Sequence, residues 1–279
     1  MARYRKESNL FKVFFGVVGA LLLVGLGLYF FFLAENPPPF EKITLCPIDK
    51  AITRAHTAVI LDRTEGLNDV QKQAIRIEMR KALEGTESYE KVSLFEIVGR
   101  SSVKAEPLLS RCNPTRPRSQ SKIVEKLETD EALALKQFQA RFLDWVMNRL
   151  EGALNVPQQQ DSPIMEVLQA VSVHALKAGA ERTRKRLLIF SDMMQHSPEY
   201  SHYRVPPSPQ FLTSAFFKKV RTDLGGVDVR VFYINRAGGP SQQPEGHYEF
   251  WKSYFTALGA SVSFVPIEGA AWVGSDKVK

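Results

Sequence analysis

The sequence lacks the motifs that mark the common classes of enzyme. It contains neither a GxSxG elbow nor a phosphate-binding glycine loop, and the dinucleotide fingerprint and the HExxH zinc motif are also missing. Only two of its 279 residues are cysteine, and their spacing is not that of a metal site. Internal repeats and low-complexity tracts do not occur. An enzyme of a motif-marked class is therefore disfavoured, and we predict that the protein is not an enzyme.

Charge is missing from one long stretch near the N-terminus. Residues 13–33 are 21 consecutive residues without a charged side chain. As a helix this stretch would be roughly 30 Å long, enough to cross the hydrocarbon of a bilayer. A core helix would carry polar positions on one side, and the apolar part of a cleaved signal peptide is usually only about 7–15 residues long. We therefore predict a retained transmembrane helix at residues 13–34.

Basic residues are concentrated on one side of this predicted span. Four Lys or Arg side chains precede it, whereas Glu35 and three prolines follow it directly. Because cytoplasmic flanks carry the excess of Lys and Arg, we expect residues 1–12 in the cytoplasm. The main domain is then extracytoplasmic, and periplasmic if the protein is bacterial. We predict a proline-rich stalk over residues 35–54 and a globular domain over residues 55–279.

The two cysteines both lie in the part of the chain that this topology exports. In an oxidising compartment Cys46 and Cys112 can form a disulfide, whereas in the cytosol they would be two unrelated thiols. The exported topology makes the disulfide the prediction to test. The net charge of +7 is only mildly basic, and it does not indicate a nucleic-acid partner.

Strand and helix patterns alternate along the predicted domain. The predicted strands are residues 57–61, 91–98, 108–112, 187–190, 227–234 and 261–265. The predicted helices begin shortly after residue 62 and continue at residues 121–154, 163–179, 210–224 and 248–258. Asn68 and Gln71 have the spacing of a capping box for the first of these helices, and Gly85 suits its end. Such alternation predicts an α/β fold with a doubly wound, mostly parallel, Rossmann-like sheet.

Oxygen-bearing side chains stand at the ends of two predicted strands. Asp62 and Asp192 each follow an apolar run, Thr64 shares the loop of Asp62, and Ser162 precedes a helix. In a parallel sheet, ligands bind at the carboxyl ends of the strands, where the strand order reverses. Carboxylates and hydroxyls are ligands of hard cations. Each residue alone could merely cap a helix or form a turn, but together they predict an Mg²⁺ or Mn²⁺ site.

The same four residues resemble the metal-ion-dependent adhesion site of the von Willebrand factor A (vWA) family, over roughly residues 55–266. The first motif of the family, Asp-x-Ser-x-Ser, is matched by Asp62 and Thr64. Its isolated threonine before a helix is matched by Ser162, and its strand-terminal aspartate by Asp192. The resemblance implies a vWA-like fold whose metal accepts an Asp or Glu side chain from a partner protein.

Two positions depart from the family pattern. Gly66 stands where the second hydroxyl of the first motif belongs, so a water must fill that place. Met193 follows the strand-terminal aspartate, where family members often have glycine.

Two other clusters of functional residue types are weaker candidates. His196, Glu199 and His202 could suggest zinc, but their spacing in a Ser/Pro/Tyr-rich loop is more typical of a solvated turn. A basic cluster precedes the strand at 187–190, and a solvated helix end is favoured over a site for anionic headgroups or for a partner. The cluster comprises Arg182, Arg184, Lys185 and Arg186.

Three functions remain after these exclusions. The favoured one is a membrane-anchored, protein-binding vWA-like module in an envelope-associated complex, with a metal at its site. A structural scaffold with a silent metal site is the second. The third is a metal-assisted hydrolase, for which Glu65 and His196 are the only evident general bases.

Overall fold

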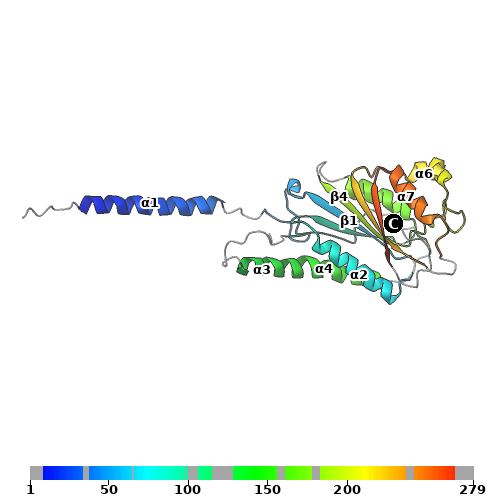
Figure 1. The fold of residues 1–279 in the computed structure, drawn as a ribbon, viewed down its shortest axis with the longest axis horizontal. Helices are drawn as coiled ribbons and strands as arrows, with labels where there is room; N and C mark the ends of the chain where they lie inside the picture. The colour runs from blue at the N-terminus through cyan, green and yellow to red at the C-terminus, as the bar shows by residue number, and fades with distance from the viewer. Residues whose placement is uncertain are drawn as a thin grey trace, which may run out of the picture. The chain divides into compact units, whose positions relative to one another are not determined.

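The computed structural model describes residues 9–33, 38–64, 66–97, 99, 106–114, 128–155, 161–177, 183–236 and 242–267. The chain forms two compact units, Met1–Pro39 and Phe40–Lys279. The first contains the helix α1 (Asn9–Leu33), which is 25 residues long and is drawn as one continuous helix in Figure 1. Side chains of α1 are described over residues 13–29. Within the described part of the chain, no helix is both long enough and apolar enough to cross a membrane.

The second unit is built on one six-stranded sheet with the order β3-β2-β1-β4-β5-β6. Its strands are β1 (Ala55–Asp62), β2 (Lys91–Ile97), β3 (Leu109–Cys112), β4 (Arg184–Ser191), β5 (Val227–Ile234) and β6 (Ser261–Ile267). All neighbouring strands are parallel except β2 and β3, which are antiparallel. The strand order reverses between β1 and β4, as in doubly wound folds. The predicted α/β class and the mostly parallel sheet are therefore confirmed, and the arrangement fits a vWA-like or Rossmann-like fold.

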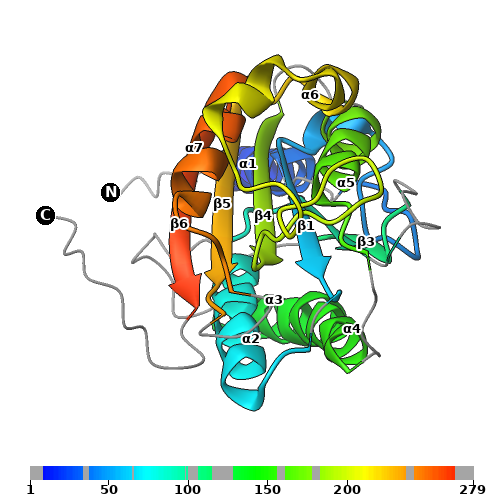
Figure 2. The same cartoon turned by 90° about the vertical axis from the view of Figure 1, so that its right-hand side faces the viewer.

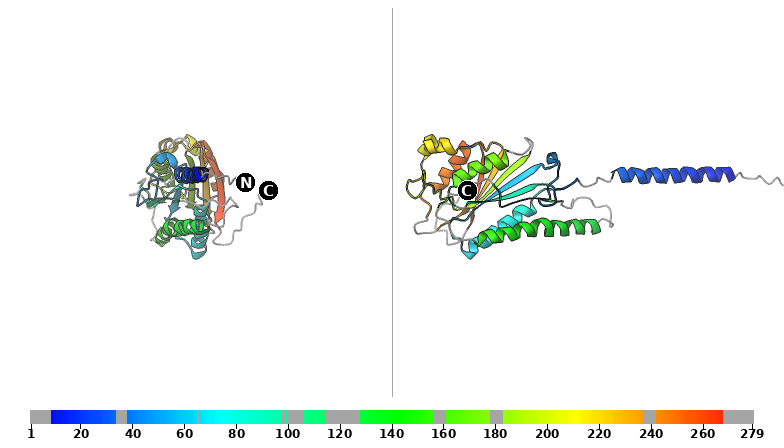
Figure 3. Two further views of the ribbon diagram at one scale, coloured as in Figure 1. Left: turned by 90° about the vertical axis from the view of Figure 1, so that its left-hand side faces the viewer. Right: turned by 180° about the vertical axis from the view of Figure 1, so that it is seen from behind.

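Helices cover both faces of this sheet. In Figures 2 and 3, α2, α3 and α4 lie on one side, and α5, α6 and α7 lie on the other. Their bounds are α2 (Asp69–Glu84), α3 (Glu128–Phe138), α4 (Asp144–Leu154), α5 (Ile164–Val171), α6 (Ala215–Val220) and α7 (His247–Ala257). Strand β1 is buried along its whole length and alternates between two cores. Ala58 and Ile60 face the α5–α7 side, whereas Val59 and Leu61 face the α2–α4 side.

Local signals placed most helices correctly. The capping box of α2 forms. The Asn68 side chain accepts from the backbone N–H of Gln71, and the Gln71 side chain accepts from the backbone N–H of Asn68. Of the helix predicted at 121–154, residues 128–154 are helical with a π-turn at Gln139–Leu143, and residues 121–127 lie outside the described part. The helix predicted from residue 163 is α5 followed by a π-turn at Ser172–Leu176.

The prediction of one continuous helix over residues 210–224 is wrong, because the segment contains two separate short helices. The chain forms a 3-10 helix at Pro209–Thr213 and then the short α6. Ser214 separates them, because its side chain accepts a hydrogen bond from the N–H of Phe217 and starts α6 anew.

The disulfide between Cys46 and Cys112 is present, so that prediction is confirmed. It ties residues 40–53 to β3, where the N–H of Cys112 also donates to the carbonyl of Thr44 at 2.8 Å. Residues 40–54, predicted as the end of the stalk, belong to the same compact unit as the sheet.

Candidate functional site

The carboxyl ends of β1 and β4 lie side by side at the point where the strand order reverses. Asp62 is the last residue of β1, and Asp192 follows Ser191, the last residue of β4. The two strands pair with Leu61 opposite Phe190. The parallel pairing therefore brings the two predicted strand-terminal carboxylates to one edge of the sheet.

Asp62 is the centre of a buried hydrogen-bonded cluster. Its Oδ1 accepts from the backbone N–H of Thr64 at 3.0 Å and from the Thr64 hydroxyl at 2.6 Å. Its Oδ2 accepts from the hydroxyls of Ser162 at 3.1 Å and of Ser191 at 2.7 Å. Three of the four predicted site residues are thus in direct contact. Sequence reasoning missed Ser191, although its position at the end of a strand beside β1 was a usable signal.

The hydroxyl of Ser162 points to Asp62 and does not cap α5. The residue before α5 is Pro163, which makes no side-chain cap, and the side chain of Gln195 accepts instead from the N–H of Met165 in the first turn at 2.9 Å. The backbone of Ser162 instead forms two hydrogen bonds with that of His196, at 2.9 and 2.8 Å. The loop after β4 therefore positions this hydroxyl, which answers the alternative that Ser162 is only a helix cap.

Asp192 is held by an arginine that sequence reasoning also missed. Its Oδ1 accepts from the N–H of Met194 at 3.0 Å, and its Oδ2 accepts from Arg236 Nε at 3.0 Å. Arg236 Nη1 donates to the carbonyl of Gly66 at 2.6 Å. The guanidinium therefore links Asp192 to Gly66 in the loop that follows Asp62. Arg236 lies two residues after the end of β5, at the same edge of the sheet, and that spacing could have revealed it.

Met193 adopts the backbone conformation that glycine would favour there. Its φ is 63°, in the left-handed region, which costs an ordinary residue about 1–2 kcal/mol. Its side chain is fully buried in the core on the α5–α7 side, and its N–H donates to Ser191 Oγ at 2.7 Å. Its carbonyl accepts from Trp251 Nε1 at 2.9 Å. These contacts offset the strain and hold the Asp192 loop in place.

The donor atoms of this cluster fit a hard divalent cation in kind. All are oxygens, and two carboxylates are the usual protein contribution to an Mg²⁺ site. Among the described residues, no group of three or more His, Cys, Asp or Glu side chains is placed to hold a metal. Because Arg236 already binds Asp192, an entering cation must compete with the guanidinium for that carboxylate.

The zinc alternative does not form. His196 Nδ1 is 2.8 Å from Ser201 Oγ, Glu199 pairs with Lys219 at the surface, and His202 is buried 3.0 Å from His247. Each of the three candidate ligands therefore has a different environment. Glu65, one of the two candidate general bases, lies outside the described residues.

The basic cluster does not lie at a helix end, because it begins β4. Arg184 pairs with Glu87 at 2.9 Å, and Arg186 pairs with the fully buried Glu90. Arg182 lies outside the described residues. Two of the four basic side chains thus neutralise acidic groups of this chain.

Known proteins resemble this chain in structure only, and at low sequence identity. No protein-family model matches the chain, and no curated protein matches it. Among solved structures, the crystal structure of the SpRpn10 VWA domain has a TM-score of 0.35 at 11% identity, over 77% of this chain and 90% of that chain. The open conformation of the pilus adhesin SpaC from Lactobacillus rhamnosus GG has a TM-score of 0.39 at 11% identity, over 81% of this chain and 28% of that chain.

Proposed function

We propose that this chain is a membrane-anchored, vWA-like module that binds an acidic side chain of a partner protein in an envelope-associated complex. The observation that carries the proposal is the cluster around Asp62, at the carboxyl ends of the two strands where the sheet order reverses. Ligands bind at this place in doubly wound sheets.

We propose further that Asp62, Thr64, Ser162 and Asp192 hold Mg²⁺ or Mn²⁺. Bound there, the ion supplies a positive charge that attracts an Asp or Glu of the partner. Arg236 holds Asp192 in its present position and neutralises it. A metal-assisted hydrolase is less well supported, because His196, the general base that the structure describes, is engaged with Ser201.

The proposal predicts that metal binding and partner capture are lost together. Calorimetry with Mn²⁺ on the full chain in detergent should detect binding in the parent. In Asp62→Asn and Asp192→Asn the affinity for Mn²⁺ should fall by more than about 100-fold. A residue that contacts the ion directly should contribute more to the affinity than an outer-sphere residue, whose loss costs about 10- to 100-fold. Asparagine is preferred to alanine at residue 62, since alanine would leave the buried hydroxyls of Thr64, Ser162 and Ser191 without their acceptor.

Further variants show whether metal binding is lost because a ligand is removed or only because a negative charge is removed. Asp228→Asn removes an exposed carboxylate from β5 and should change nothing. Gly66→Ser restores the missing hydroxyl of the first motif and should tighten metal binding. Capture of partners from detergent extracts should fail with chelator. No heat with either metal in the parent, together with unchanged capture by Asp62→Asn, would leave a silent site and favour the scaffold.

The membrane anchor rests on the 21 uncharged residues at 13–33 and on the basic residues before them. A reporter enzyme that works only outside the cytoplasm, fused after Lys279, should be active. The same fusion without residues 1–34 should be inactive, because nothing would export it. Activity of a reporter that works only in the cytoplasm would contradict this topology.

A further inference from the structure

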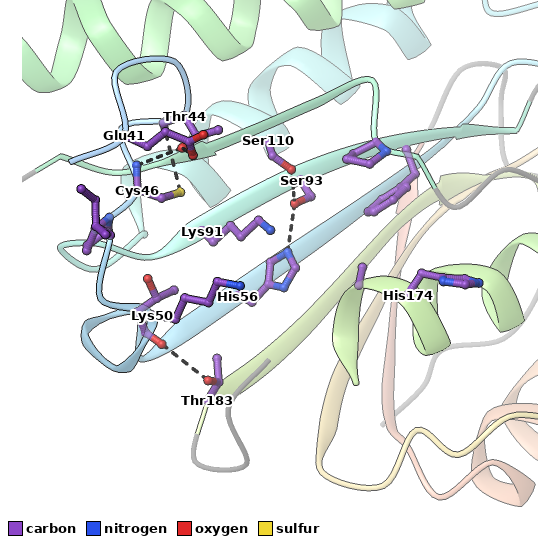
Figure 4. A pocket seen from close by; sticks show the side chains of 16 residues that line it. Glu41, Thr44, Cys46, Lys50, His56, Lys91, Ser93, Ser110, His174 and Thr183 are labelled. Atoms are coloured by element: carbon purple, nitrogen blue, oxygen red, sulfur yellow. Dashed lines mark hydrogen bonds between the residues drawn. The ribbon is translucent and has the colours of Figure 1, made fainter. Parts of the chain in front are cut away.

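A cavity of about 630 Å³ lies at the opposite end of β1 from Asp62. Its walls come from the starts of the central strands, and His56 near the beginning of β1, Lys91 at the start of β2 and Thr183 just before β4 all line it. Figure 4 shows these side chains around one space. The cavity is therefore separate from the cluster at the carboxyl ends of the strands.

The cavity borders the sheet face at β2 and β3 and the π-turn Ser172–Leu176 after α5. Ser93 on β2 pairs with Ser110 on β3, and both line the cavity with Phe95, which belongs to the α5–α7 core. The opposite wall is the segment from Glu41 to Lys50, which the disulfide to Cys112 ties to β3. A covalently held segment and a sheet face thus form two sides of the space.

A buried polar chain forms the floor. His56 Nε2 is 3.0 Å from Ser93 Oγ, which is 2.8 Å from Ser110 Oγ. His56 and Ser93 are only 6% and 1% exposed. Burial, and then the charge of Lys91, lower the pKa of His56 to about 4, so the imidazole is neutral at pH 7. The chain therefore contributes hydrogen-bonding groups but no charge.

The charge of the cavity comes from two lysines. In Figure 4 the side chains of Lys50 and Lys91 extend into the space beside His56. Burial, and then the charge of Lys50, lower the pKa of Lys91, and Glu41 acts in the opposite direction. Among the described residues, no carboxylate lies within ion-pair distance of either ammonium group. Glu41, the carboxylate of the lining, accepts from the hydroxyl of Thr44 at 2.6 Å.

We propose that this cavity binds a phosphate-bearing organic molecule, with its phosphate group on Lys50 and Lys91. A phosphate monoester carries a charge of about −1.5 to −2 at pH 7, which matches two ammonium groups. The hydroxyls of Ser110 and Thr53 add hydrogen-bonding groups, and Ile48 and other apolar residues face the organic part. The volume lies in the range of about 300–1,000 Å³ that small-molecule sites occupy. A soluble phosphate ester and a phospholipid headgroup share this chemistry.

Calorimetry on the full chain in neutral detergent tests the assignment with two probes, glycerol 3-phosphate and dihexanoyl phosphatidic acid. At least one should bind, and Lys50→Gln/Lys91→Gln should weaken it by about 100-fold or more, because each of the two lost charge-assisted hydrogen bonds contributes about 10- to 100-fold. Lys50→Glu, a change at an exposed residue, should weaken it as well without affecting the fold. The matched control Lys218→Gln/Lys252→Gln removes the same charge from the exposed surface of α6 and α7 and should bind as the parent does.

The two probes separate the sources of the phosphate. Binding of the lipid at least 10-fold more tightly than glycerol 3-phosphate indicates a headgroup, and comparable binding indicates a soluble ester. Failure of both probes at millimolar concentration overturns the assignment, and so does an equal loss in the control. Asp192→Asn should leave this affinity unchanged, so the result is independent of the site at Asp62.

Discussion

Lowering the pH from 7 to 5 is expected to destabilise the folded domain by about 6 kcal/mol, through three buried histidines. Burial lowers the pKa of His56 and of His247 to about 4 and that of His202 to about 2, from the usual 6.5. At pH values between these folded-state pKa values and 6.5, the unfolded chain binds more protons than the folded chain. Stability is therefore complete above about pH 7 and decreases as the pH falls through 6.5, by about 2 kcal/mol for each histidine at pH 5.

Burial keeps two of these rings neutral, and their hydrogen bonds suit the neutral form. His247 Nε2 accepts from Trp251 Nε1 at 3.2 Å and lies 3.0 Å from His202 Nδ1. His247 Nδ1 lies 2.5 Å from the hydroxyl of Tyr233. A proton on His202 Nε2 would have no acceptor among the described residues. Charging either ring therefore places a cation in an aromatic core without a counter-charge.

Urea unfolding followed by tryptophan fluorescence at pH 7 and pH 5 measures this effect. His56→Gln should reduce the difference between the two pH values by about 2 kcal/mol, because one of the three titrating groups is gone. His174→Gln removes an exposed histidine and is the matched control. Equal pH dependence in the parent and in His56→Gln, or an equal reduction in the control, would contradict the prediction.

Loss of the disulfide is expected to reduce the free energy of unfolding by about 4 kcal/mol in the chain-entropy account. Cys46 and Cys112 are separated by 66 residues, so their bond closes a long loop in the unfolded chain. The same bond holds the segment that walls the cavity, with help from Arg111 Nη1, which donates to the carbonyl of Ile43 at 3.1 Å. We therefore expect reduction to weaken ligand binding in the cavity as well as stability.

The comparison is between the parent with and without reductant and the variant Cys46→Ser/Cys112→Ala. The reduced parent and the variant should unfold at the same, lower urea concentration, and reductant should not affect the variant. Identical midpoints for the oxidised and reduced parent would show that the bond does not constrain the folded domain.

Local patterns in the sequence were sufficient for the α/β class, for the capping box at Asn68 and for the strand-terminal positions of Asp62 and Asp192. These features depend on residues within one or two turns or on a two-residue period, so neighbours along the chain decide them. The prediction of one continuous helix at 210–224 was wrong, and the cause is again local. Ser214 starts a new helix, and this signal is stronger than the apolar spacing around it.

The contacts that define the two sites depend on strand order, which no local pattern encodes. Only the pairing of β1 with β4 places Ser191 on Asp62, and only the position of β5 beside β4 brings Arg236 to Asp192. The cavity likewise needs β2, β3 and the disulfide-held segment together, and the pKa values of the histidines follow from burial among residues far away in the sequence. Periodicity along the chain therefore determined which elements form, whereas long-range packing determined which side chains meet and with what charge.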